Sequence, residues 1–201
     1  MSGLELVIAV AAGYLIGAIP SGVLIGRLRG VDPRESGSGR TGTTNAIRTL
    51  GPRWAAAVAL LDVAKGVVAV VVGGLAGPEP WAGPLAGVAA VVGHVRSIFI
   101  GFGGGRGVAT GAGAMLVLAP LAVLASLPEF GLVVWWTRLV SLGSILASVT
   151  AALVAAALFA IGSVGIEVVV AAALISVMVV IAHADNLQRL LAGTERRIGD
   201  G

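Results

Sequence analysis

Apolar residues fill long, uninterrupted stretches of this 201-residue chain, and the polar residues are gathered in the short segments between them. A helix needs about 20 apolar residues to cross a bilayer. We therefore expect membrane-spanning helices at residues 4–25, 54–75, 81–101, 142–161 and 164–182. The apolar stretches are continuous and do not alternate with polar residues, which argues against a β-barrel.

The stretch from residue 107 to 137 does not fit this pattern, because it is too long for one crossing and short for two. Pro120 and Pro128 interrupt it, and Glu129 follows the second proline. We expect two short helices here, the fourth and fifth spans, with a turn near residues 120–129. A re-entrant hairpin in a protein of five spans is the alternative.

Charged residues make up only 11% of the chain, against roughly 25% in soluble domains. With seven crossings and the 27–53 loop in the cytoplasm, no Lys or Arg lies on the outer side, where Glu5, Glu79, Glu129 and Glu167 are gathered. The positive-inside rule expects this separation. We therefore predict an all-α integral membrane protein: a compact bundle of seven transmembrane helices, N-terminus outside and C-terminus cytoplasmic, folded as a single domain over residues 1–201.

The net charge of +3 fits the same picture, since basic residues kept on the cytoplasmic side explain it without nucleic acid as a partner. The chain has no cysteine, which excludes disulfides, thiol catalysis and cysteine-ligated metals. The chemistry must therefore lie in the polar segments between the helices.

The first polar segment, residues 35–51, combines four glycines with hydroxyl groups, Asn45 and Arg48. Glycine-rich turns expose backbone N–H groups and form anion-binding nests, above all before a helix N-terminus. The segment nearly matches a dinucleotide fingerprint, but no strand precedes it. It also resembles a P-loop, but Thr43 occupies the lysine position. A plain Gly/Ser linker is the alternative, although a linker needs neither Asn45 nor Arg48.

Two further segments have a similar composition. Residues 93–110 contain His94 and a run of glycines that ends at Arg106, followed by an expected helix start. Near the C-terminus, His183, Asn186 and Arg189 recur at three-residue spacing and so share one face of a helix end. For either histidine, a hydrogen-bonded residue at the membrane interface is the competing interpretation.

Charged or hydroxylated residues also lie within one expected helix and at the start of another. Asp62 and Lys65 lie inside the second expected span, where a charge costs roughly 2.5–3.5 kcal/mol on insertion scales, so such residues usually pair or line a cavity. Their i, i+3 spacing allows an ion pair that serves the helix alone. Arg138 and Ser141 mark another basic, hydroxylated helix entrance, for which an ordinary cytoplasmic anchor is the alternative.

At these residues the sequence resembles a known family, the bacterial acyl-phosphate:glycerol-3-phosphate acyltransferases of the membrane-embedded PlsY type. The first family motif is matched by Gly37, Ser38, Gly39, Gly42, Thr44, Asn45, Arg48 and Gly51, and a short DxxKG element by Asp62, Lys65 and Gly66. The second motif is matched by Gly93, His94, Phe99, Phe102, Gly104, Gly105, Gly107, Val108, Ala109 and Thr110. The third is matched by His183, Asn186, Arg189, Leu190, Gly193 and Glu195.

The chain departs from the family pattern at a few positions. Arg40 replaces an Asn, Thr43 an Ala, Ser97 a Pro, and Gly103 and Arg106 replace two Lys. The resemblance nevertheless covers the whole chain in order and spacing. It implies a seven-helix bundle with a cytoplasmic active site in a bacterial plasma (inner) membrane. The implied reaction moves an acyl chain from acyl phosphate to the sn-1 hydroxyl of glycerol 3-phosphate, giving lysophosphatidic acid and phosphate for phospholipid synthesis.

The three segments and the resemblance together give the candidate site. The catalytic candidates are Ser38, Arg48, Arg106, His183 and Asn186, and the substrate-binding candidates are Gly39, Thr44, Asn45, Lys65, His94, Gly104, Gly105, Ser141 and Arg189. Acyl phosphate is already activated, so positioning and charge stabilisation suffice, and no metal or cofactor is expected. The His-x4-Asp pair of other glycerolipid acyltransferases is absent, because Phe99 and Gln188 stand at its Asp position.

The expected partners are glycerol 3-phosphate, acyl phosphate and membrane lipids, and we expect a monomer. Two other functions use the same features. A transporter for an organic phosphate needs a basic vestibule too, but such proteins usually carry broken or charged helices at the membrane midplane in two repeats. An inactive, lipid-binding homologue is suggested only by the departures in the second motif.

Overall fold

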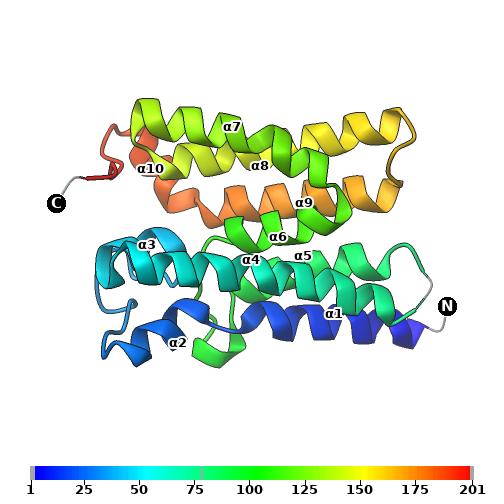
Figure 1. Ribbon diagram of the computed structural model, residues 1–201, viewed down its shortest axis with the longest axis horizontal. Helices are drawn as coiled ribbons and strands as arrows, with labels where there is room; N and C mark the ends of the chain where they lie inside the picture. Colours follow the sequence, from blue (N-terminus) through cyan, green and yellow to red (C-terminus); the bar gives the residue numbers. More distant parts are fainter. Residues whose placement is uncertain (1–2, 78, 200–201) are drawn as a thin grey trace. The chain divides into compact units, whose positions relative to one another are not determined.

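The computed structural model describes residues 3–77 and 79–199, and it is all-α, as the sequence predicts (Figure 1). By its internal contacts the chain divides into two compact units, Met1–Leu118 and Ala119–Gly201. The first unit contains α1 (Gly3–Ala18), α2 (Ser21–Leu28), α3 (Thr43–Leu50), α4 (Pro52–Leu75), α5 (Ala82–Val95), the short 3-10 turn η1 (Ile98–Ile100) and α6 (Val108–Leu118). The second contains α7 (Pro120–Thr137), α8 (Val140–Ala160), α9 (Ile166–Ala182) and α10 (Ala184–Leu191).

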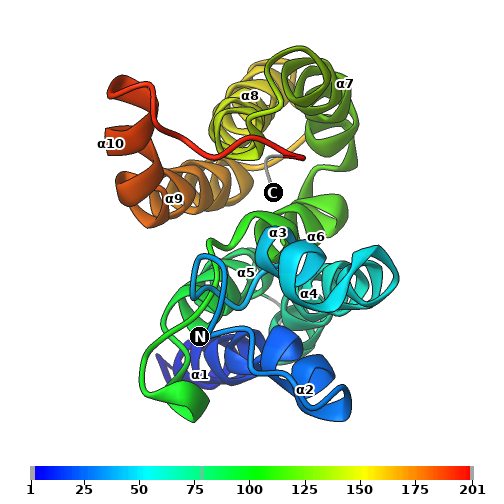
Figure 2. The same cartoon turned by 90° about the vertical axis from the view of Figure 1, so that its left-hand side faces the viewer.

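Close helix packing in the first unit depends on small residues. Within it, α1, α4 and α5 lie side by side, and the end-on view shows α6 beside α4 (Figure 2). A Cβ on Gly66 of α4 would overlap the Thr110 carbonyl oxygen of α6, and one on Gly113 would overlap that of Val63. In a membrane, where apolar burial between helices adds little, such backbone approach supplies the van der Waals contact that holds helices together.

The first expected span, residues 4–25, is broken in the structure. The first helix ends at Ala18, and α2 starts at Ser21, directly after Pro20. Proline has no N–H to donate and disfavours helical backbone at the residue before it, so the helix ends there. The break leaves carbonyl groups at the end of α1 and directly after it for other partners, and those of Ala18 and Ile19 accept side-chain donors from the site.

The expected turn in residues 107–137 lies at a different place from the one predicted. The chain breaks at Ala119, and Pro120 opens α7 at a first-turn position, where a missing N–H costs nothing. Pro128 and Glu129 lie inside α7 and not in the expected turn. The Oε2 atom of Glu129 is buried and has no hydrogen-bond partner among the described residues.

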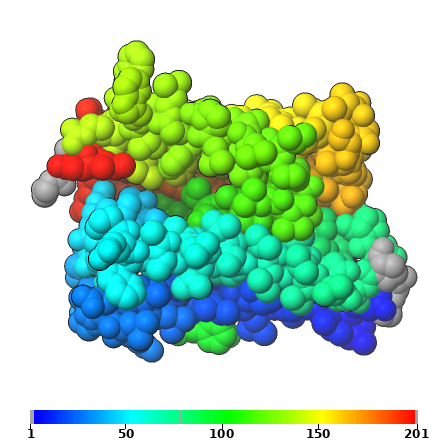
Figure 3. Space-filling view, viewed as in Figure 1, coloured from blue at the N-terminus to red at the C-terminus, as the bar shows by residue number. Residues whose placement is uncertain are grey.

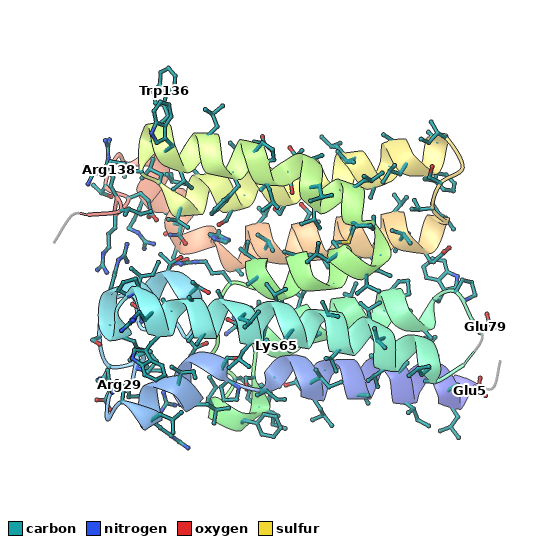
Figure 4. The ribbon with its side chains drawn as sticks, in the orientation of Figure 1. Glu5, Arg29, Lys65, Glu79, Trp136 and Arg138 are labelled. Carbon is teal, nitrogen blue, oxygen red and sulfur yellow. The ribbon has the colours of Figure 1, made fainter. Side chains whose placement is uncertain are left out.

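By length and composition, four of the described helical segments are long and apolar enough to cross a membrane, counting residues 3–28 as one, and a fifth is obtained if α9 and α10 form one bent span. These last two helices meet at 60°, and α5 and α6 are shorter apolar helices. In the first unit, Arg29 lies at one end of the helices, and Glu5 and Glu79 lie at the other (Figure 4).

Aromatic residues are found near the basic ends of helices in both units. Arg29 stacks over the Trp54 ring at 5.2 Å. In the second unit the C-terminal end of α7 projects from the surface (Figure 3), and Trp136, which is 79% exposed, is the projecting side chain (Figure 4). Tryptophan beside arginine is typical of the membrane–water interface.

Candidate functional site

The loop between α2 and α3 is organised around one side chain, Asn45. Its Nδ2 group donates to the carbonyl oxygens of Pro33 (2.7 Å), Arg40 (2.9 Å) and Ser36 (3.2 Å). Its Oδ1 atom accepts the Ser38 N–H at 2.8 Å. The side chain is only 2% exposed, so its amide is committed to loop backbone. Asn45 therefore shapes the loop, and the surrounding backbone rather than this amide is available to a ligand.

The glycines of this loop have the backbone conformations that a nest requires. Gly37 and Gly39 have φ values of +65° and +68°, in the left-handed region that other residues rarely adopt. A Cβ on Gly37 would also collide with Asn45 Oδ1. The loop leads into α3, whose N-cap is Gly42, and Arg48 extends from the exposed side of that helix.

The second glycine segment, residues 103–107, lies beside the first within the same unit. A Cβ on Gly42 would come within 3.9 Å of the Gly105 Cα, so the start of α3 and the second nest are neighbours. Gly107, with φ of +81°, then turns the chain into α6. Two glycine segments that are 60 residues apart in the sequence thus lie side by side.

His94 supports the second segment from behind. Its backbone carbonyl accepts the Gly105 N–H at 3.1 Å, and a Cβ on Gly105 would overlap the imidazole Nε2. Gly104 is confined in the same way by the His94 and Val95 carbonyl groups. Any side chain at either position would displace this histidine or the loop.

Ser97, which replaces the family proline, stabilises the turn that precedes the nest. Its N–H donates to the Gly103 carbonyl at 2.9 Å, and its hydroxyl donates to the Ala18 carbonyl at 2.5 Å. Tyr14 donates its hydroxyl to the Arg96 carbonyl at 2.9 Å. The broken end of α1 is therefore tied to the turn between α5 and η1.

Asp62, Lys65 and His94 form a buried charged cluster. The expected i, i+3 ion pair is confirmed, with 2.9 Å between Lys65 Nζ and Asp62 Oδ1. His94 Nδ1 lies 3.5 Å from the same oxygen, and Lys65 also donates to the Ile19 carbonyl at 3.1 Å. Lys65 is 7% exposed and lies midway along the unit (Figure 4). Its ammonium therefore contacts protein groups and not an open surface.

In the second unit, the Glu195 carboxylate joins three predicted site residues. Ser141 and Asn186 donate to Oε1 at 2.8 and 2.5 Å, and Arg189 donates to Oε2 at 2.8 Å. Burial raises the pKa of Glu195, but these hydrogen bonds outweigh it and hold the pKa below its usual range. The carboxylate is thus ionised at neutral pH and fixes all three donors.

The other predicted residues of this unit are held by the backbone. His183 donates through Nδ1 to the Val179 carbonyl oxygen at 2.8 Å, and the residue is 2% exposed. Arg138 has a left-handed backbone (φ 62°) and donates through Nε to the Ile198 carbonyl at 2.8 Å, while Ile198 N–H donates back to the Arg138 carbonyl. The C-terminal segment is therefore tied to the start of α8.

The structure thus gathers the predicted residues into two sets. The first unit holds Ser38, Gly39, Thr44, Asn45, Arg48, Lys65, His94, Gly104, Gly105 and Arg106, and the second holds Ser141, His183, Asn186 and Arg189. Two acids were not predicted as site residues: Asp62, which lies beside Lys65 and His94, and Glu195, which accepts from Ser141, Asn186 and Arg189. Both occur in the quoted motifs, and an acid beside basic and amide groups was the signal that pointed to them.

Comparison with known proteins tests the family assignment. The family described as glycerol-3-phosphate acyltransferase matches residues 7–193 of the chain. The chain belongs to this family. Named glycerol-3-phosphate acyltransferases of Synechococcus sp. strain CC9902 and Symbiobacterium thermophilum are 42% and 44% identical to it, over 98% and 97% of the chain and 97% and 96% of their own lengths.

Solved structures agree with the sequence comparison. The crystal structure of PlsY (YgiH), an integral membrane glycerol 3-phosphate acyltransferase, in its glycerol 3-phosphate form matches with a TM-score of 0.88 and 36% identity. The match covers 96% of each chain. The lysophosphatidic acid form of PlsY matches with a TM-score of 0.86. The predicted family is confirmed, and so are the predictions of an acyltransferase and of a bacterial membrane protein.

Proposed function

We propose that the protein transfers an acyl chain from acyl phosphate to the sn-1 hydroxyl of glycerol 3-phosphate. The observation that carries this proposal is the side-by-side placement of the Gly37–Gly42 loop and the Gly103–Gly107 segment. Both substrates bear a phosphate, and two neighbouring nests with separate arginines, Arg48 and Arg106, suit two anions. The PlsY structures are named for glycerol 3-phosphate and lysophosphatidic acid, the acceptor and the product of the proposed reaction.

The reaction needs little covalent chemistry from the protein. The substrate hydroxyl oxygen attacks the acyl carbonyl carbon, the bond between that carbon and the phosphate oxygen breaks, and inorganic phosphate leaves. A substrate phosphate oxygen accepts the hydroxyl proton, so no protein base is required. The nests and arginines stabilise the charge that develops on the leaving phosphate and position the two reactants.

The proposed roles of the individual residues follow from their contacts. In the first unit, Ser38, Gly39, Thr44 and Arg48 bind one phosphate through the loop that Asn45 shapes, and Gly104, Gly105 and Arg106 bind the other. In the second unit, His183 and Asn186 contribute polar groups for a substrate hydroxyl, with Ser141 and Arg189 fixed beside Asn186 by Glu195. Asn186 Oδ1 is buried without a hydrogen-bond partner among the described residues, which suits acceptance of a substrate hydroxyl.

We also propose seven membrane spans, with the N-terminus outside and the C-terminus and active site in the cytoplasm. The spans are α1–α2, α4, α5, α6, α7, α8 and α9. The distribution of charge supports this topology, because Arg29 lies at the opposite end of the first unit from Glu5 and Glu79 (Figure 4). We propose further that residues 1–201 act as a single domain and as a monomer.

A donor comparison tests the function. Purified protein is supplied with glycerol 3-phosphate and, in turn, palmitoyl phosphate, palmitoyl-CoA and palmitoyl-acyl carrier protein, and lysophosphatidic acid is measured. We expect product from palmitoyl phosphate alone and none from the Arg48→Ala variant. Near-normal turnover by that variant rules out the role of Arg48. Uptake of glycerol 3-phosphate into proteoliposomes without covalent change favours a transporter instead.

A further inference from the structure

Asp62 is a buried acid for which the proposed chemistry has no direct use. It lies inside α4 and is 1% exposed. An ionised carboxylate within a membrane span must be paired, and its Oδ1 atom has two cationic or donor groups nearby, Lys65 Nζ at 2.9 Å and His94 Nδ1 at 3.5 Å.

The two neighbours of Asp62 contact different parts of the unit. Lys65 contacts the broken end of α1, because its Nζ atom donates to the Ile19 carbonyl. His94 leads to the second glycine nest, because its carbonyl accepts the Gly105 N–H at 3.1 Å and its ring lies against the Gly105 Cα. Nδ1 is the ring nitrogen that faces Asp62, and Nε2 is the one that a Cβ on Gly105 would meet. The imidazole therefore lies between the carboxylate and the nest.

We propose that Asp62 is a positioning residue for acyl transfer and that it acts through His94. The carboxylate fixes the ring, and the ring supports the Gly104–Gly105 backbone in the shape that binds a substrate phosphate. Carboxylates that orient histidines in this way are common around metal sites, where the histidine then holds a ligand. This inference rests on the proposed function, which places a phosphate in this nest.

The competing explanation is that Asp62 only neutralises Lys65. Asp62→Asn alone does not separate the two, because it also leaves a buried ammonium without its counter-charge. The Asp62→Asn/Lys65→Gln double variant removes both charges. If Asp62 serves only Lys65, this variant regains normal activity. If Asp62 positions His94, it regains thermal stability but not substrate affinity.

The experiment measures KM for both substrates, kcat and Tm for the wild type, for each of these variants and for Glu5→Gln, a control that removes a carboxylate at the opposite end of the first unit from Arg29. We expect the double variant to recover much of the Tm lost in Asp62→Asn while the KM for one phosphate substrate stays raised by about tenfold, with a smaller change in kcat. Wild-type KM values for both substrates in the double variant would overturn the proposal.

Two further measurements keep the test decisive. If the double variant does not fold, a double-mutant cycle replaces it: Asp62→Asn should add less than about twofold to the KM defect of His94→Ala, and fully additive effects would contradict action through His94. The rise in Tm with inorganic phosphate reports on the nest without acyl transfer. That rise should be smaller in both Asp62 variants, whereas failure of the proposed function alone appears as absence of product from the wild type.

Discussion

The role of Asn45 gives the sharpest prediction about the proposed phosphate loop. Its amide makes four contacts with the backbone of residues 33–40, and all four are lost in Asn45→Ala. Two N–H groups and one oxygen supply these contacts, so we count three effective hydrogen bonds. At about 0.5–1.5 kcal/mol each, their loss lowers the free energy of loop opening by about 1.5–4.5 kcal/mol.

Limited proteolysis measures this quantity directly, because the loop contains Arg34 and Arg40. When opening is fast relative to cleavage, the rate follows the population of the open loop, and the computed loss raises trypsin cleavage after these residues by about tenfold to a thousandfold. Mass spectrometry of the fragments identifies the cleavage site.

The alternative role from the sequence, direct contact of the Asn45 amide with substrate, predicts a different result. KM would then rise in Asn45→Ala while the cleavage rate stayed at the wild-type value. Thr49→Val is a matched control, since it removes one hydrogen bond to the Asn45 carbonyl and leaves the loop contacts in place. Unchanged cleavage in Asn45→Ala would refute the loop-shaping role.

The remaining predictions concern the connections around the site. Ser97→Ala should lower the stability of the purified protein by about 1–3 kcal/mol, seen as a lower Tm, because the Ala18 carbonyl loses its donor in a buried position. Gly66→Ala should lower the Tm by forcing α4 and α6 apart, while Gly74→Ala, which meets nothing within 4 Å, should not. The lowered pKa of Glu195 means that its ionised form stabilises the fold, so the contribution is full above about pH 4.5 and is lost as the pH falls through the depressed pKa. Glu195→Gln should therefore remove that part of the acid sensitivity from a Tm-against-pH series, and an unchanged series would show that the carboxylate contributes nothing.

Much of the fold was predictable because a bilayer imposes simple rules on the sequence. Continuous apolar stretches predicted helices, and the i, i+3 spacing of Asp62 and Lys65 predicted their ion pair. The effect of Pro120 and Pro128 on the helices was harder to predict. Pro120 starts a helix and Pro128 is accommodated inside one, and the difference depends on neighbouring packing that the sequence pattern does not contain.

The motifs predicted which residues belong to the candidate site but not how they are used. Asn45 lies in a motif typical of ligand binding, yet its side-chain partners are three backbone carbonyl groups, up to 12 residues away, and one backbone N–H. Likewise, nothing in the spacing of α4 and α5 brings His94 to Asp62, because that contact depends on how two helices pack. Local sequence specifies donors and acceptors, whereas tertiary structure decides which of them remain available to a substrate.

The departures in the second motif are compatible with an intact nest, which bears on whether this family member is active. Ser97 has φ of −75° and ψ of 122°, a backbone conformation that proline also adopts, so the turn is the one that the family residue favours. Its N–H and hydroxyl add bonds that a proline lacks. At Gly103 a Cβ would meet nothing nearer than 3.5 Å, so the backbone there does not depend on the absence of a side chain. The substitution at residue 103 therefore removes one charge without altering the fold of the nest, and Arg106 keeps a cation at its end. The backbone geometry of these residues therefore offers no support for a damaged nest, and the lost charge at residue 103 is the one change left that favours an inactive homologue.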